Sequence, residues 1–293
     1  MADLPQRLYG VVGHPVAQSL SPVLHNWGFS HLGIPGVYMA WDKSALELPA
    51  FVEAVRSLPI HGASVTIPGK EAVLALADKL TPAARKIGAA NTLYWEGREL
   101  VGTNTDMDGF LYPLDGKRPP AALVLGAGGA ARAVLAGLME LGVEKIYLAA
   151  RSTARIAQLQ ADFPCTPVPW EERAEALQGM GPGLVVNVTP LGMYGETRGE
   201  SAMPENAWPD IRNCGKEGGP EEGSFGHVAY DVVYNPRETV FLQQARSRGW
   251  ETIDGLKFFV AQGVSQFRLW TGQGLPFAQA MRVAEEALER RRQ

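Results

Sequence analysis

A glycine-rich phrase near the middle of the chain limits the possible folds more than any other feature. Gly126-Ala-Gly-Gly-Ala-Ala131 follows directly after the apolar run 122–125 and leads into helical periodicity over 129–141. The first glycine permits a tight turn, the second lets backbone approach a pyrophosphate, and Ala131 keeps helix and sheet close. The helix start would offer free N–H groups to phosphates. Because a strand precedes and a helix follows, the phrase predicts a dinucleotide site rather than only a tight strand-to-helix turn.

The regions before and after this phrase have different patterns, which predicts an α/β protein of two domains. At 293 residues the chain exceeds the usual size of a single core. Beyond Asp106, strands and helices alternate as in a doubly wound, Rossmann-type parallel sheet. The expected segments are the strands 122–125, 145–149, 184–188 and 227–233 and the helices 129–141, 155–163 and 238–248. This cofactor domain is expected to span 107–254.

The remaining residues, 1–106 plus 255–293, are expected to form a discontinuous α/β substrate domain. No strand follows the two final helices, 255–270 and 276–291, so they are placed on the N-terminal half. The other expected elements are the strands 8–12, 37–41 and 62–66, the helices 22–29, 46–58, 70–77 and 82–88, and a hairpin of 92–95 with 99–102. The polar segment 195–226 is too irregular for a core element and is interpreted as either a flap or a surface excursion.

The composition indicates an ordinary globular protein. The chain is 46% hydrophobic and 20% charged, with a net charge of -4, so neither nucleic acid nor an anionic membrane is an expected partner. No apolar run approaches the ~20 residues of a membrane span, and the N-terminus lacks the apolar core of a signal peptide, so a cytoplasmic protein is expected. Cys165 and Cys214 are far apart and predict free thiols, and no metal site is expected.

Arginines at the end of the second strand of the cofactor domain favour NADP over NAD. NAD enzymes usually place an acidic residue there to bind the ribose hydroxyls. This chain has Ala150-Arg151-Ser152, with Arg155 one turn on. A guanidinium binds a 2'-phosphate that a carboxylate would repel. The alternative is that both arginines are solvated surface charges.

Two serines at the start of a helix suit a carboxylate ligand. Ser19 and Ser21 precede Pro22, and a helix N-terminus with nearby hydroxyls can hold an anion. Ser21 also fits a helix N-cap followed by proline, and both roles can coexist.

Lys70 and Asp106 are candidate catalytic residues in two short, glycine-marked phrases. Lys70 begins the expected helix 70–77, where the dipole disfavours a cation, and such a lysine can carry a proton in catalysis. A solvated lysine is the alternative. The neighbouring loops supply neutral donors and acceptors suited to a ligand with several hydroxyl groups, namely Asn91, Thr92, Asn104 and Thr105.

Together these phrases resemble the shikimate dehydrogenase family along nearly the whole chain. Eight motifs carry the resemblance in matching order: Ser19-Leu-Ser-Pro-Val-Leu-His-Asn26, Val65-Thr-Ile-Pro-Gly-Lys70, Gly88-Ala-Ala-Asn-Thr92, Asn104-Thr-Asp106, Gly126-Ala-Gly-Gly129, Asn187-Val-Thr-Pro-Leu-Gly-Met193, Tyr230-Asp-Val-Val-Tyr-Asn-Pro236 and Asp254-Gly-Leu-Lys-Phe-Phe-Val-Ala-Gln262. The family implies reversible, NADPH-dependent reduction of 3-dehydroshikimate to shikimate, in the route to chorismate and the aromatic amino acids. It also implies a homodimer by analogy.

The resemblance assigns roles to individual positions. Lys70 and Asp106 would be catalytic. The substrate would be bound by Ser19, Ser21, Thr66, Lys70, Asn91, Asp106, Tyr234 and Gln262. NADP would be bound by Gly126, Ala127, Gly128, Gly129, Ala130, Arg151, Ser152, Arg155, Asn187, Thr189, Val232 and Gly255.

Two departures from the family pattern leave alternatives open. Ala150-Arg151-Ser152 stands where the family often has Asn-Arg-Thr, which bears on cofactor preference, and the segment 195–226 is longer than usual. One alternative is a quinate or quinate/shikimate dehydrogenase that uses NAD, against which Ser19 and the two arginines argue. The other is a non-catalytic, NADP-sensing homologue, which would be expected to lack the lysine or the aspartate.

Overall fold

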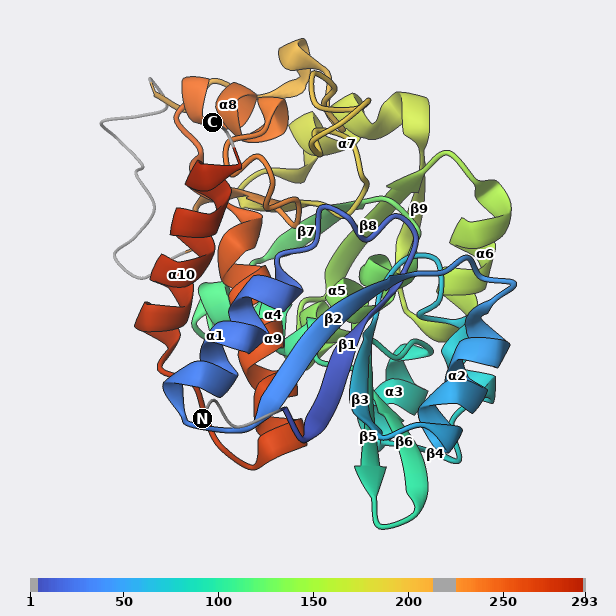
Figure 1. Cartoon of the computed structure of the whole chain (residues 1–293). Helices are drawn as coiled ribbons and strands as arrows, with labels where there is room; N and C mark the ends of the chain where they lie inside the picture. The colour runs from blue at the N-terminus through green and yellow to red at the C-terminus, as the bar shows by residue number, and fades with distance from the viewer. Residues whose placement is uncertain (1–4, 213–224, 292–293) are drawn as a thin grey trace. The chain divides into compact units, whose positions relative to one another are not determined.

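The computed structural model describes residues 5–212 and 225–291, which form two compact units. The first unit is Met1–Gly109 with Val260–Gln293, and the second is Phe110–Phe259. Each unit holds its own six-stranded sheet with helices on its faces (Figure 1), so the predicted α/β class with two sheets is confirmed. The chain passes between the units within helices α4 (Asp106–Leu111) and α9 (Gly255–Thr271).

The first unit contains a mixed sheet in the order β2-β1-β3-β5-β6-β4. Its strands are β1 (Arg7–Gly13), β2 (Gly36–Asp42), β3 (Ile60–Val65), β4 (Lys79–Leu80), β5 (Thr92–Glu96) and β6 (Glu99–Thr103). Strand β1 pairs in parallel with β2 and β3, whereas β5 pairs antiparallel with β3 and β6. The β5–β6 pair is the predicted hairpin, and Gly97 turns it with a φ of 62° that other residues rarely adopt.

Alternate residues of β1 face two apolar layers, as the two-residue period of a strand requires. Tyr9 and Val11 pack with Phe29 and Phe267, on the side of α1 (Ser21–His31), α9 and α10 (Phe277–Arg290). Val12 packs on the other side, toward α2 (Leu48–Ser57) and α3 (Pro82–Ile87). Figure 1 shows these helices on their two sides of the β1–β3 strands. The sheet is therefore covered on both faces.

The second unit is a doubly wound parallel sheet, as predicted. Its strand order is β12-β11-β10-β7-β8-β9, and all the pairs are parallel. The strands are β7 (Ala121–Leu125), β8 (Lys145–Ala150), β9 (Thr166–Pro169), β10 (Gly183–Asn187), β11 (His227–Asp231) and β12 (Glu251–Ile253). Counted from β7 along the chain, this is the 3-2-1-4-5-6 order of dinucleotide-binding folds, in which the order reverses between β7 and β10.

The helices of the second unit cover both faces of its sheet. They are α5 (Gly129–Glu140), α6 (Thr153–Asp162), α7 (Arg173–Met180) and α8 (Val240–Ser247), with 3-10 helices at Tyr112–Leu114, Trp170–Glu172 and Glu205–Ala207. Strands β9 and β12 and helix α7 are additions to the elements predicted from the sequence. They are short, so their own periodicity carries little signal.

The prediction that the segment 195–226 contributes nothing to the core was wrong. Met203 and Trp208 are 1% and 3% exposed, and Trp208 packs edge-on against Phe241 of α8 and against Trp250. The composition of the whole segment is mainly polar, so these two apolar residues were not recognised as core residues. Residues 213–224 and the predicted free thiol of Cys214 lie outside the described residues.

Two local predictions around helix starts were wrong, and one was confirmed. The expected helix 70–77 is only a 3-10 turn, Ala72–Ala75, so Lys70 does not stand at the positive end of an α-helix. Helix α1 begins at Ser21 itself, with Leu20 as its N-cap and no capping side chain. Thr81-Pro82 opens the expected helix 82–88 with the same pattern of a hydroxyl residue before proline, and there the Thr81 hydroxyl does accept a hydrogen bond from the Ala84 N–H and caps α3.

Across residues 5–212 and 225–291, none of the helices combines the length and apolarity that crossing a bilayer would require.

Candidate active site

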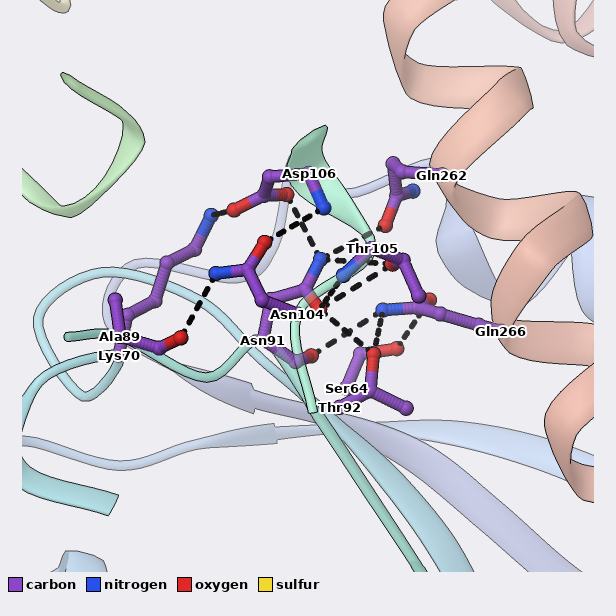
Figure 2. A network of polar contacts seen from close by, with 10 residues as sticks. All are labelled: Ser64, Lys70, Ala89, Asn91, Thr92, Asn104, Thr105, Asp106, Gln262 and Gln266. Atoms are coloured by element: carbon purple, nitrogen blue, oxygen red, sulfur yellow. Dashed lines mark hydrogen bonds and ion pairs between the residues drawn. The ribbon is translucent and has the colours of Figure 1, made fainter. Parts of the chain in front are cut away.

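A buried ion pair between Lys70 and Asp106 lies at the centre of the first unit's polar network. Lys70 Nζ is 2.6 Å from Asp106 Oδ2, and the two side chains are 13% and 3% exposed (Figure 2). Lys70 follows strand β3 in a loop, whereas Asp106 opens helix α4 after strand β6. The fold thus joins two residues 36 positions apart, as the proposed catalytic pairing needs.

Asn91 holds the other oxygen of the Asp106 carboxylate. Its Nδ2 donates to Asp106 Oδ1 at 2.8 Å and to Thr105 Oγ1 at 3.0 Å, and it lies 3.4 Å from Gln262 Oε1. The Asn91 side-chain oxygen accepts from the Thr105 N–H at 2.8 Å. Each carboxylate oxygen of Asp106 therefore has a donor, which fixes its orientation in a site that excludes most water.

Asn104 locks the start of helix α4. Its side-chain oxygen accepts from the Asp106 N–H at 2.9 Å, and its Nδ2 donates to the Ala89 carbonyl at 2.9 Å. The Ala90 N–H in turn donates to the Lys70 carbonyl. The loops that carry the lysine and the aspartate are therefore tied together through backbone as well as through the ion pair.

The two serines predicted to bind a carboxylate lie together in the loop that leads into α1. The Ser21 N–H donates to Ser19 Oγ at 3.2 Å, and Ser21 is buried whereas Ser19 is partly exposed. Arg291 donates to the carbonyls of Gln18 and Ser19 at 2.6 and 3.1 Å, which anchors this loop to the C-terminal end of α10. Arg291 and the Ser19 hydroxyl therefore hold the loop, and the Ser21 side chain does not cap the helix.

The remaining predicted substrate residues fall in both units. Thr66 directly follows β3 and is partly exposed, and Gln262 on α9 is 8% exposed next to Asn91. Tyr234 belongs to the second unit, where its ring lies 4.7 Å from the ring of Phe259.

Three buried polar side chains that sequence reasoning did not select complete the network. Tyr38 donates to Ser64 Oγ at 2.6 Å, and Ser64 donates to Gln266 Oε1 at 2.8 Å. Burial raises the pKa of Tyr38, an effect that the hydroxyls of Ser64 and Ser21 partly offset. Gln266 lies one helical turn after Gln262, and that four-residue spacing is the signal that could have found it.

The glycine turn of the second unit has the geometry of a phosphate site. Gly126 has a φ of 115°, and a Cβ there would lie 2.9 Å from the side chain of Thr189, so only glycine fits. A Cβ on Gly128 would meet no atom within 4 Å, which leaves open space at the start of α5. No side chain caps this helix, and its first turn contains no acidic residue. The residues present therefore fit a pyrophosphate.

The predicted arginines lie at the neighbouring strand end. Arg151 directly follows β8, and Arg151 and Arg155 are both exposed. Ser152 caps α6, because its hydroxyl accepts from the Arg155 N–H at 3.3 Å. This cap sets the turn on which both guanidinium groups are carried.

Asn187, predicted to line the cofactor, is fully buried and engaged within its own loop. Its side-chain oxygen accepts from the N–H and the hydroxyl of Thr189, and its Nδ2 donates to the Leu191 carbonyl and to Asp231 Oδ1. Asp231 also accepts from Thr239 Oγ1 at 2.6 Å and from the Val233 N–H. Burial raises the pKa of Asp231 to about 7, against the lowering effect of these three donors.

Val232 and Gly255, also predicted to line the cofactor, lie against each other. A Cβ on Gly255 would lie 2.5 Å from the Val232 carbonyl oxygen, so no other residue fits without a backbone shift. Arg237 pairs with Asp254 at 2.8 Å beside this contact, and Asp254 accepts from the Leu256 N–H at the start of α9.

The first unit holds a lysine amine, a fixed carboxylate and several neutral amides, and the second unit holds a glycine turn whose open helix start suits a phosphate. An ammonium group held in a site of low polarity can stabilise charge that grows on a carbonyl oxygen and can also supply a proton. Among the described residues, no cluster of three or more histidine, cysteine, aspartate or glutamate side chains has the geometry to hold a metal ion.

Family models match two segments of the chain, most of whose residues belong to the first unit. The family model of the shikimate dehydrogenase substrate binding domain matches residues 11–93, and that of the shikimate 5'-dehydrogenase C-terminal domain matches residues 255–285. The shikimate dehydrogenase (NADP(+)) of Oleidesulfovibrio alaskensis is 44% identical over 287 residues, which cover 97% of each chain.

Solved structures show the same likeness across both units. Shikimate 5-dehydrogenase from Thermus thermophilus, in complex with NADP(H) and shikimate, has a TM-score of 0.80 and 37% identity and covers 96% of this chain and 99% of its own. Quinate dehydrogenase from Corynebacterium glutamicum, in complex with NAD, has a TM-score of 0.81 and 27% identity and covers 95% of this chain and 98% of its own. With 44% identity to a curated relative over nearly its full length, this chain belongs to the shikimate dehydrogenase family.

Proposed function

We propose that this protein catalyses the reversible, NADPH-dependent reduction of 3-dehydroshikimate to shikimate in the biosynthesis of chorismate and the aromatic amino acids. The observation that carries the proposal is the Lys70–Asp106 pair, buried among amides in the first unit of a chain of this family. A non-catalytic homologue would have no need of a buried lysine and aspartate oriented in this way. A catalytic role is therefore preferred over that of a non-catalytic, NADP-sensing homologue.

Lys70 is the proposed proton carrier. In the reduction, its ammonium group stabilises the negative charge that grows on the substrate carbonyl oxygen and transfers a proton to that oxygen. In the oxidation, the neutral amine accepts the same proton from the hydroxyl group. Asp106 orients the lysine and a neighbouring substrate hydroxyl, and Asn91 keeps the carboxylate in place. When bound, NADPH supplies the hydride.

The substrate is proposed to lie in the first unit, among charged side chains and neutral hydroxyl and amide side chains. The hydroxyls of Ser19 and Ser21 bind its carboxylate, and the family resemblance also assigns Tyr234 to the substrate. The ring hydroxyls are held by Thr66, Lys70, Asn91, Asp106 and Gln262. This donor set suits a small, polyhydroxylated acid.

NADP is proposed to bind the second unit. The glycine turn and the uncapped start of α5 hold the pyrophosphate, as the open space at Gly128 allows. Arg151 and Arg155, on the turn shaped by Ser152, bind the 2'-phosphate. Thr189 and Val232 line the cofactor and Gly255 faces its nicotinamide, and Asn187 acts by fixing the loop that carries Thr189.

In domain terms, we propose residues 1–106 plus 255–293 as the substrate-binding domain and 107–254 as the NADP-binding domain. A homodimer and a cytoplasmic location stay predictions. Analytical ultracentrifugation of the purified chain and fractionation of the source cells are the measurements for these two.

A quinate/shikimate dehydrogenase that uses NAD is the rival function. The likeness to the solved quinate dehydrogenase favours considering it. The exposed arginine after β8, where NAD enzymes have an acidic residue, argues for NADP.

The decisive experiment measures initial rates from the absorbance of the reduced nicotinamide with four pairings: shikimate or quinate, each with NADP or NAD. We expect shikimate with NADP to have the highest kcat/KM. A higher kcat/KM for quinate with NAD would establish the rival, and no turnover in any pairing would refute an enzyme of this kind.

A further inference from the structure

The side-chain amide of Gln266 occupies the junction between the core of the first unit and the candidate catalytic residues. The side chain is 1% exposed, and its Nε2 donates to the Asn91 carbonyl at 3.2 Å and to Thr92 Oγ1 at 2.9 Å (Figure 2). Its Oε1 accepts from Ser64 at 2.8 Å. Helix α9, strand β3 and the start of strand β5 therefore meet at one amide.

The orientation of this amide is fixed by chemistry. The Asn91 backbone carbonyl can only accept, so Gln266 must present nitrogen to it. The second proton of that nitrogen then points to Thr92 Oγ1, which serves as an acceptor. The single hydroxyl proton of Thr92 is left to donate to the Asn91 side-chain oxygen, 2.7 Å away.

This donation is one of two that hold the Asn91 amide in its orientation. Its oxygen is held by the Thr92 hydroxyl and the Thr105 N–H, so its nitrogen is turned toward Asp106 Oδ1 at 2.8 Å. A flipped amide would place its oxygen against the carboxylate oxygen, which is repulsive. The Thr105 N–H can only donate and so requires the Asn91 oxygen on its side, and the Thr92 hydroxyl, oriented by Gln266, supplies the second donor that holds the amide, and with it Asp106 and Lys70, in this arrangement.

We propose that Gln266 is a positioning residue for the reaction, acting through Thr92 to hold the Asn91 amide with its nitrogen toward Asp106. This inference rests on the proposed function of the same site. It assigns to α9 a second contribution besides Gln262, made from within the core and without contact with the substrate.

The test compares steady-state oxidation of shikimate by NADP in wild type and Gln266→Met, which keeps the side-chain length and removes both donors. Loss of the Gln266 hydrogen bonds that hold this network in position should lower kcat about tenfold. The KM for shikimate should change less than about twofold, because Gln266 has no place in binding. The profile of kcat against pH should also move, since the Lys70–Asp106 pair is no longer held in one geometry.

Two further variants separate positioning from general destabilisation. Thr92→Val removes the relay hydroxyl and should reproduce the loss of kcat, whereas Thr92→Ser keeps the hydroxyl and should restore most of it. Trp95→Phe is the matched control, because it deletes one hydrogen bond to the Ile60 carbonyl in the same sheet. It should lower the melting temperature with kcat unchanged.

A double-mutant cycle with Asn91→Ala gives the sharpest outcome. If Gln266 acts through the Asn91 side chain, adding Gln266→Met to Asn91→Ala should lower kcat by less than about twofold. An undiminished tenfold loss in that background, or no loss in the wild-type background, would overturn the inference. If Gln266→Met does not fold, the Thr92 pair carries the same test. Failure of the proposed function is distinguishable, because wild type itself would then show no turnover.

Discussion

A buried histidine makes the folded state sensitive to acid. His25 on α1 is 0% exposed, and its ring stacks on Tyr38 at 4.5 Å and lies 5.1 Å from the ring of Trp270. Neither ring nitrogen has a hydrogen-bond partner among the described residues. Burial lowers the pKa of His25 to about 3 from its usual 6.5, and the nearby Gln266 amide offsets only part of this.

The sign and size of the effect follow from linkage. Between pH 6.5 and 3 the unfolded chain binds a proton at this histidine and the folded chain does not, so stability falls as the pH falls. Each pH unit within the window removes about 1.4 kcal/mol of unfolding free energy. Between pH 7.5 and 5 the loss from His25 alone should be about 2 kcal/mol.

The assay is urea unfolding of wild type and His25→Phe at pH 7.5 and pH 5. At pH 7.5 both rings are uncharged in both states, so the difference there reports packing alone. The other titrating groups contribute equally to both proteins, so the extra loss in wild type at pH 5 isolates the histidine. We expect the variant to lose about 2 kcal/mol less than wild type. Equal losses would refute the reasoning.

Three other perturbations test separate parts of the structure. If the Arg151 guanidinium binds the 2'-phosphate, Arg151→Ala should weaken NADPH binding about tenfold or more and NADH binding less than about twofold. Fluorescence titration measures both affinities, and equal losses for the two cofactors would contradict this role. Asp231, with its pKa raised to about 7, binds a proton in the folded state that the unfolded state releases above pH 4, so the contribution of this carboxyl group to stability should fall as pH rises from 4 to 7, opposite in sign to that of His25. In urea unfolding Asp231→Asn should lack this component, and an unchanged slope would count against it. Gly255→Ala should lower the free energy of unfolding by about 1–3 kcal/mol because the added Cβ meets the Val232 carbonyl. Gly179→Ala, where a Cβ meets no atom within 4 Å, should not destabilise the protein. Equal effects of the two substitutions would contradict the close contact between Gly255 and Val232.

The features predictable from the sequence are those with a local signal. The glycine turn before α5, the alternating strands of the second sheet and the β5–β6 hairpin each depend on residues next to one another, and the structure has them all. Lys70 and Asp106 were selected for their chemistry and for the resemblance. Their contact at 2.6 Å depends on how strands β3 and β6 are placed in the sheet, which no local pattern encodes.

The failures have physical causes as well. The stretch 70–77, where an α-helix was expected, is short and forms only the 3-10 turn Ala72–Ala75. Trp208 was missed because the polar residues around it dominate the composition of 195–226. Gln266 was missed because its four-residue spacing from Gln262 places both amides on one helix face but does not show the partners of Gln266, which lie far away in sequence.

The central claim is that Lys70, oriented by Asp106, moves the proton in the reduction of a carbonyl group, and the kinetics of Lys70→Ala test it most directly. Alongside wild type with shikimate and NADP, the variant should lose about 100-fold or more in kcat, while the KM for shikimate changes far less. A variant that folds like wild type and keeps its kcat would contradict the account.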